Sequence, residues 1–282
     1  MIAKKMEHLV ANSSAIRAMF EEGNRLAAIY GKENVFDFSL GNPNVAAPEA
    51  VKQAILEILE EDPLAVHGYT NSNAGYEEVR KAVADSLNER FGTAFAAKNI
   101  TMTVGAAGGL NVILKTLLNP GDEVIVFAPY FGEYRSYVAN FDGVLVEISP
   151  DTQTFQPKLD EFEAKITPKT KAVIVNTPNN PTGVVYSEET IKKMAAIMEA
   201  KQEEYKSEIY LISDEPYREL VYDGVEVPYL TKYYANTIVG YSYSKSLSLP
   251  GERIGYLVIP DEVKDSEDVI SAANVANRIL GF

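Results

Sequence analysis

A lysine and an arginine stand out in the stretch Ser242–Gly255, which reads Ser-Tyr-Ser-Lys-Ser-Leu-Ser-Leu-Pro-Gly-Glu-Arg-Ile-Gly. Lys245 closely follows an apolar run, Thr237–Tyr243, that we predict to be a strand, and lysine is seldom buried unless it is paired. Desolvation lowers the pKa of an amine, and a neutral amine is a nucleophile suited to a Schiff base with an aldehyde. Arg253, later in the same stretch, offers a fork of N–H donors that fits a phosphate.

Small residues follow another apolar run, Ile100–Val104, and precede a helical pattern over Leu110–Leu118. They read Gly105-Ala106-Ala107-Gly108-Gly109. Backbone N–H groups at the start of a helix favour an anion such as a phosphate. The segment matches neither GxxxxGK[ST] nor GxGxxG, and a tight strand-to-helix turn explains it more simply.

Amide and carboxylate groups follow two further predicted strands. The loop Asn176–Gly183, which reads Asn-Thr-Pro-Asn-Asn-Pro-Thr-Gly, either turns the chain or holds an asparagine amide toward a ligand. Asp214-Glu215-Pro216-Tyr217 comes after the run Ile209–Ser213, and its proline ends that strand. The carboxylate of Asp214 either caps a helix or faces a ligand.

An alternation of β-rich and helical segments positions these groups. Several apolar runs, such as Ala172-Val173-Ile174-Val175, are apolar on both faces, as in strands covered by helices on both sides. Helical spacing occurs over Gly75–Phe91 and over Ser187–Glu199, where Ser187 is a plausible cap. We therefore predict an α/β fold with three layers and a mostly parallel, seven-stranded sheet, whose ligands bind beyond the carboxyl ends of the strands. The predicted strands are Ile100–Val104, Glu123–Pro129, Val144–Ile148, Lys171–Asn176, Ile209–Ser213, Thr237–Tyr243 and Gly255–Ile259.

The composition excludes several other kinds of chemistry. The chain has 282 residues, no cysteine and two histidines, which excludes cysteine-bound metals, disulfides and thiol catalysis. Its formal net charge of −14 argues against nucleic acid and anionic membranes as partners. It has no apolar run of roughly 18 residues, as a membrane span needs, and no signal-peptide pattern. We predict a cytoplasmic protein with no metal, nucleic-acid or membrane partner.

One cofactor matches all the groups at the strand ends. They offer an amine for an aldehyde, a carboxylate for a ring nitrogen, polar groups for a ring oxygen, and a helix N-terminus with hydroxyls and an arginine for a phosphate. Pyridoxal 5′-phosphate carries each of these partners. We therefore predict that the chain binds pyridoxal 5′-phosphate.

The chain resembles the class I/II aminotransferases, the fold type I pyridoxal-phosphate enzymes. Ser242–Gly255 is similar to the lysine signature of that family, and Asn180–Gly183 and Asp214–Tyr217 are similar to two further motifs, over a likeness from about Asn34 to Pro260. The resemblance implies transfer of an amino group from an acidic or aromatic amino acid to a 2-oxo acid such as 2-oxoglutarate, in amino acid metabolism. It also implies a homodimer.

The resemblance also implies roles for individual residues. Lys245 forms the Schiff base and moves a proton, Asp214 pairs with the ring nitrogen, and Tyr217 and Asn180 hydrogen-bond the ring oxygen. The other expected cofactor contacts are Gly105, Ala106, Ala107, Ser242, Ser244 and Arg253 at the phosphate, Phe131 stacked on the ring, and Tyr69 reaching the neighbouring subunit's phosphate. Gly41 and Asn180 are expected to face the substrate.

The resemblance does not extend to a C-terminal domain. Family members continue into a small domain there, which binds the substrate carboxylate through an arginine. We expect residues 1–47 to form an N-terminal arm and part of the small domain. Residues 48–282 are expected to form the large cofactor-binding domain, incomplete at its C-terminal end, in a truncated chain. Two alternatives remain: a pyridoxal-phosphate-dependent C–S β-lyase or decarboxylase on the same site, and a cofactor-binding module without turnover.

Overall fold

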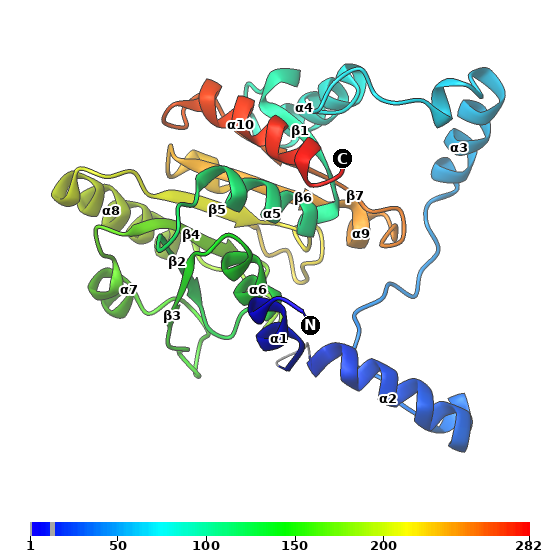
Figure 1. The fold of residues 1–282 in the computed structure, drawn as a ribbon, viewed down its shortest axis with the longest axis horizontal. Helices are drawn as coiled ribbons and strands as arrows, with labels where there is room; N and C mark the ends of the chain where they lie inside the picture. The colour runs from blue at the N-terminus through cyan, green and yellow to red at the C-terminus, as the bar shows by residue number, and fades with distance from the viewer. Residues whose placement is uncertain (1, 12–14) are drawn as a thin grey trace.

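The computed structural model describes residues 2–11 and 15–282 and shows a central sheet with helices on both faces (Figure 1). Its helices are α1 (Lys4–Ala11), α2 (Ala15–Tyr30), α3 (Glu49–Glu61), α4 (Glu77–Phe91), α5 (Gly105–Leu117), α6 (Glu133–Asn140), α7 (Leu159–Lys165), α8 (Glu188–Tyr205), α9 (Tyr243–Ser246) and α10 (Ser266–Ile279). Its strands are β1 (Ile100–Val104), β2 (Glu123–Phe127), β3 (Val144–Ile148), β4 (Thr170–Asn176), β5 (Tyr210–Asp214), β6 (Thr237–Ser242) and β7 (Ile254–Val258).

The seven strands form one sheet in the order β1-β7-β6-β5-β4-β2-β3. The neighbouring pairs β3–β2, β2–β4, β4–β5 and β5–β6 are parallel, and β7 is antiparallel to both β1 and β6. The predicted mostly parallel, seven-stranded α/β fold is confirmed. Because β7 runs against the others, its first residue lies at the edge where the other strands end, which brings the preceding Arg253 to that edge.

The core lies in two layers, one on each face of the sheet. Val124 and Val126 of β2 pack with α5, α6 and α10, whereas Ile125 and Phe127 pack with α7 and α8. Helix α4 packs on β1, β6 and β7 in a third cluster. Burial of both faces explains why central strands such as β4 carry continuous apolar runs, and it leaves the strand ends as the place for polar groups.

Helix α5 begins earlier than the sequence predicts. The small residues from Gly105 to Gly109, expected as a turn, already form its first turns. A Cβ at Gly109 would lie 3.3 Å from both Leu257 and Thr103, so the absence of a side chain lets the helix lie close to the sheet. Close packing here outweighs the low helix propensity of glycine, and the first backbone N–H groups of α5 face the carboxyl edge.

Helices α2 and α3 lie apart from the sheet (Figure 1). Helix α3 has no buried residue, and its apolar side chains Ile55, Leu56, Ile58 and Leu59 are exposed. The segment between α2 and α3 nevertheless returns to the sheet edge, where Gly41 contacts Lys245. The division at residues 47 and 48 stays a prediction, and α3 begins next to it.

Candidate active site

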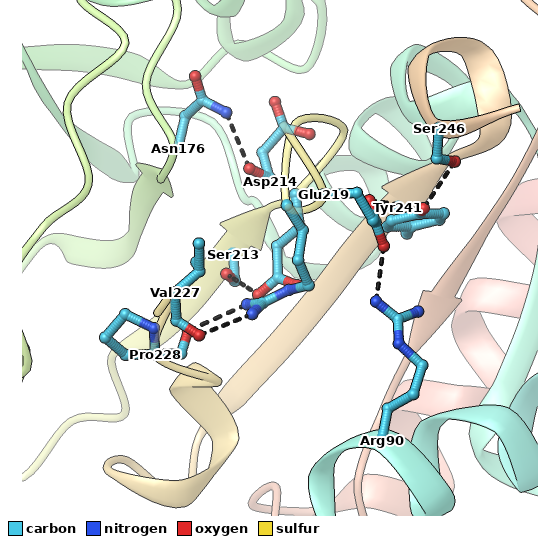
Figure 2. Close-up of polar contacts among 11 residues, drawn as sticks. Arg90, Asn176, Ser213, Asp214, Glu219, Val227, Pro228, Tyr241 and Ser246 are labelled. Atoms are coloured by element: carbon cyan, nitrogen blue, oxygen red, sulfur yellow. Dashed lines mark hydrogen bonds and ion pairs between the residues drawn. The ribbon is translucent and has the colours of Figure 1, made fainter. Parts of the chain in front are cut away.

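Asp214 ends β5 at the carboxyl edge and is buried, with 4% of its surface exposed. The Tyr134 hydroxyl donates to Asp214 Oδ2 over 2.5 Å. Asn176 is its register partner on β4 and donates from Nδ2 to the Asp214 backbone oxygen over 2.9 Å (Figure 2). Asp214 Oδ1 has no hydrogen-bond partner among the residues that the structure describes.

Burial sets the protonation of this carboxyl group. Burial raises the pKa of Asp214 to about 6. The hydrogen bond from Tyr134 lowers this pKa, and the nearby charge of Glu215 raises it. Burial and the Asp214 charge raise the pKa of Tyr134 well above its usual value, so Tyr134 remains a donor. A buried carboxylate oxygen without a donor is costly, and a protonated ring nitrogen would supply both the missing donor and a positive charge.

Asn180 and Tyr217 meet beside Asp214, as the sequence predicts for two groups that share one ring oxygen. Asn180 Nδ2 donates to the Tyr217 hydroxyl over 3.2 Å, and the Asn180 backbone N–H donates to Asn176 Oδ1 over 2.7 Å. Burial raises the pKa of Tyr217, and the Asp214 charge adds to this. The two side chains therefore offer an amide N–H and a protonated hydroxyl at one place.

The groups expected at the phosphate come from three segments. The Ser242 Oγ donates to Ser244 Oγ over 2.7 Å and accepts from the Ser244 backbone N–H over 3.1 Å. The Arg253 guanidinium lies against Gly105, where a Cβ would be 2.9 Å from Arg253 Nη2 and φ is +67°. A side chain at this position would displace the arginine. Ala106 and Ala107 follow in the first turn of α5.

Arg253 carries a charge that no carboxylate neutralises among the described residues. It donates from Nη1 to the Pro250 oxygen over 2.9 Å and is exposed. Together with the free N–H groups of the first α5 turn, this cation forms an anion-binding corner that fits a phosphate.

Lys245 lies in the single turn of α9, just beyond β6, and is partly exposed. The strand predicted over Thr237–Tyr243 ends one residue early, because the chain turns into α9 after Ser242. Its Nζ donates to the Gly41 backbone oxygen. Burial and, secondly, the Arg253 charge lower the pKa of Lys245. The amine therefore has the raised neutral fraction that a nucleophile requires.

Two predicted residues are held differently from the rest. Phe131 is partly buried and meets Tyr134 edge to face, with ring centroids 5.7 Å apart. Phe131 thus lies next to Tyr134, which hydrogen-bonds Asp214. Its contacts suit an aromatic residue of the core as well as one that stacks on a cofactor ring. Tyr69 is fully exposed, so it does not join the groups at the strand ends, and its reach into a neighbouring subunit stays a prediction.

Sequence reasoning did not find Tyr134 or the role of Asn176. Tyr134 is fully buried in the first turn of α6, and no local motif links it to Asp214. Asn176 ends β4, directly after the apolar run Ala172–Val175, and a buried amide there needs a partner. The two residues together fix the carboxyl group and the main chain of Asp214.

Two other kinds of site are absent from the part of the chain that the structure describes. Its His, Asp and Glu side chains nowhere form a group of three that could hold a metal ion. None of its helices combines the length and the hydropathy needed to cross a membrane. The polar groups that do gather are those at the carboxyl edge of the sheet.

Comparison with known proteins places this fold and site in one family. Residues 33–279 match the family described as aminotransferase class I and II. The chain therefore belongs to the class I and II aminotransferases, as its motifs predict.

Individual relatives agree with this assignment. The chain is 32% identical over 264 residues to aspartate aminotransferase from Pyrococcus horikoshii, covering 90% of this chain and 62% of that protein. A crystal structure of an aminotransferase from Eubacterium rectale superposes with a TM-score of 0.95 at 49% identity, covering 100% of this chain and 71% of that one. Aspartate aminotransferase from Thermus thermophilus with maleate gives 0.85 at 29% identity, with coverage of 99% and 68%. The chain thus spans about 62% of the length of the curated relative.

Proposed function

We propose that this chain carries the pyridoxal-phosphate site of an aminotransferase that moves an amino group from an amino acid to a 2-oxo acid. The observation that carries the proposal is the pair formed by Asp214 and Lys245. Asp214 Oδ1 is buried without a donor, and Lys245 is an amine with a lowered pKa at the same edge of the sheet.

The residues present fit this cofactor. Lys245 Nζ is the amine for its aldehyde, Asp214 the acceptor for its ring nitrogen, and Asn180 and Tyr217 the donors for its ring oxygen. When bound, pyridoxal phosphate supplies an electron sink for negative charge at the substrate Cα. Its phosphate would be held by the first turn of α5 and by Gly105, Ala106, Ala107, Ser242, Ser244 and Arg253, while Phe131 would stack on the ring.

Proton handling then falls to two residues of this chain. Asp214 would keep the ring nitrogen of the bound cofactor protonated, because an adjacent carboxylate raises the pKa of a base. Lys245 Nζ would accept the proton from the substrate Cα and would later return it. A positioned acid–base group of this kind contributes about 10²–10⁴-fold in rate.

The proposal extends to substrates, assembly and domains. The amino-group donor is an acidic or aromatic amino acid and the acceptor is 2-oxoglutarate; relatives named aspartate aminotransferase support the acidic donor. Exposed Tyr69 would reach the second site of a homodimer, and Gly41 and Asn180 would face the substrate. Residues 1–47 would form an arm and part of a small domain beside the large domain of residues 48–282, and the protein would work in the cytoplasm, which the lack of cysteine supports.

Cofactor attachment is tested by absorption spectroscopy of the chain with pyridoxal phosphate, followed by borohydride reduction and peptide mass mapping. We expect a visible band and a reduced adduct on Lys245, which Lys245→Ala abolishes and the exposed-lysine control Lys264→Ala retains. An adduct scattered over many lysines would overturn the cofactor proposal.

Reaction type is tested separately. Aspartate or an aromatic amino acid should bleach the visible band, and 2-oxoglutarate should restore it with glutamate as product. Release of pyruvate and ammonia instead would assign the site to a β-lyase, and release of carbon dioxide to a decarboxylase. A band that no amino acid changes would indicate a cofactor-binding module without turnover.

A further inference from the structure

The turn after β5 presents its side chains to opposite sides. Asp214 contacts α6 through Tyr134, and Tyr217 contacts Asn180 in the loop after β4. In the same turn, Arg218 pairs with Glu215 and faces the end of α4, where its guanidinium lies 5.1 Å from the ring centroids of Phe91 and Tyr229. Whatever fixes Glu215 and Arg218 therefore also fixes the direction of Asp214 and Tyr217.

Arg218 joins the beginning and the end of a loop that has no helix or strand. Its Nε donates to Glu215 Oε2 over 2.5 Å, and Glu215 Oε1 accepts from Ser213 Oγ over 2.7 Å. Its Nη1 and Nη2 donate to the backbone oxygens of Val227 and Pro228, both over 3.0 Å (Figure 2). One planar group thus holds residues 213–215 and residues 227–228 together.

The burial of this ion pair argues for a role other than stability. The side chains of Arg218 and Glu215 are only 5% and 1% exposed. Removing two ions from water is costly, and a well-packed apolar pair of similar volume is often as stable. What an apolar pair cannot reproduce is the fixed geometry of a guanidinium that bonds a carboxylate and two carbonyl groups at once.

We infer that Arg218 is a positioning residue, which holds Asp214 and Tyr217 toward the cofactor site by clamping Glu215 to Val227 and Pro228. The inference rests on the proposed function for the ligand that Asp214 and Tyr217 meet. Arg218 itself faces away from that ligand, so it acts through the turn.

Three variants separate positioning from stability. Arg218→Met removes the clamp and leaves the Glu215 charge buried and unpaired, so it lowers the melting temperature. The double variant Glu215→Gln/Arg218→Met removes both charges and regains most of that loss. Arg80→Met is the matched control, because Arg80 also donates to two backbone oxygens, those of Gly75 (3.2 Å) and Ala97 (2.7 Å).

Two readouts report on the turn. In the cofactor-free chain, we expect amide hydrogen exchange over residues 215–220 to be at least about tenfold faster in the double variant, because the loop opens locally. The dissociation constant for pyridoxal phosphate should rise about tenfold or more, a loss on the scale of one or two hydrogen bonds. Arg80→Met should change neither by more than about twofold, even where it lowers the melting temperature.

The result that overturns the inference is a double variant whose exchange and cofactor affinity match the unsubstituted chain. Arg218 would then serve stability alone. Exchange is measured without cofactor, so it decides the role of Arg218 even if the unsubstituted chain binds no pyridoxal phosphate. Failure of that binding counts instead against the proposed function.

Discussion

The two halves of the candidate site are built in different ways. The sheet half, with Asp214, Asn176 and Tyr134, is buried and held by hydrogen bonds between strand ends and α6. The open half, with Lys245 and, in the proposed homodimer, Tyr69, is partly or fully exposed, and Lys245 is held by the segment between α2 and α3. The sheet half is therefore formed before any ligand arrives, whereas the open half depends on segments outside the sheet.

Burial has opposite effects on the charged groups of the two halves. It raises the pKa of Asp214 to about 6 and lowers the pKa of Lys245. In both cases, desolvation disfavours the charged form. The carboxyl group lacks a cationic donor and the amine gains nucleophilicity, so one cause prepares both halves for a cofactor with a protonated ring and an aldehyde.

The largest effect should come from the open half. Lys245→Ala should abolish covalent attachment of pyridoxal phosphate and lower the transfer rate by about 10²–10⁴-fold, because it removes the acid–base group. Its effect on the free energy of unfolding should be within about 0.5 kcal/mol, because the side chain is partly exposed. Stopped-flow half-reactions and urea unfolding measure the two quantities. A stability loss as large as the rate loss would contradict the division between the halves.

In the sheet half, the raised pKa of the buried Asp214 should make the stability of the chain depend on pH. The folded pKa of Asp214, about 6, exceeds the ordinary value of 3.8, so the folded chain binds this proton more tightly than the unfolded chain. The stabilisation is fully present below pH about 3.8 and is lost as the pH rises through about 6. Between pH 4 and 7 the chain should thus lose about 2 kcal/mol of unfolding free energy relative to Asp214→Asn.

Urea unfolding of the cofactor-free proteins at several pH values measures that difference. The Asp214→Asn protein serves as the reference, because it contains every titrating group of the unsubstituted chain except Asp214. If the two stability curves run parallel from pH 4 to 7, the carboxyl group is not perturbed as its burial indicates.

The contrast between the halves also explains what the sequence could predict. Apolar strands such as Ala172–Val175 predict a sheet covered on both faces, and the residues after each strand mark its carboxyl edge. Asp214 could be found because it lies at the end of a strand, and Asn180 and Tyr217 because they lie in the loops that follow strands. Apolar runs and the polar residues near their ends are local patterns, so they can be read from the sequence without knowledge of the fold.

Contacts between distant segments could not be predicted in the same way. Tyr134 and Asp214 are 80 residues apart, and Gly41 and Lys245 are 204 apart, so no spacing rule joins them. The start of α5 at Gly105 is not predicted, because close packing on Leu257 and Thr103 favours glycine at Gly109, within the first turns of the helix. In each case, the tertiary structure decides what propensity leaves open.

A smaller effect should follow from Tyr134→Phe. It removes the hydroxyl donor to a buried carboxylate, a hydrogen bond worth about 2 kcal/mol, and it should raise the pKa of Asp214 further. The matched control is Tyr234→Phe, since the buried Tyr234 hydroxyl donates over 2.7 Å to the neutral backbone oxygen of Ile209. At pH 7, Tyr134→Phe should lose more unfolding free energy than Tyr234→Phe does. The difference between the two losses should be smaller at pH 4, where Asp214 is protonated. Equal losses at both pH values would mean that the Asp214 charge plays no part.

The smallest effect should come from Tyr69, the most exposed residue of the open half. Tyr69→Phe should change the unfolding free energy by less than about 0.5 kcal/mol, as expected for a surface position. In the proposed homodimer, its hydroxyl would contact the neighbouring phosphate, and loss of one hydrogen bond should raise the dissociation constant for pyridoxal phosphate about fivefold. Tyr222→Phe, at another exposed tyrosine, is the control and should leave that constant unchanged.

Protein concentration separates a contact between subunits from one within the chain. Equilibrium binding of pyridoxal phosphate, measured above and below the concentration at which sedimentation shows the dimer to dissociate, should reveal the Tyr69→Phe defect only in the dimer. A defect of equal size in monomer and dimer would place Tyr69 in its own site, and no defect at either concentration would remove it from the open half. The sheet half predicts the reverse behaviour, because the contacts of Asp214 with Tyr134 and Asn176 lie within one chain and its variants should act alike at both concentrations.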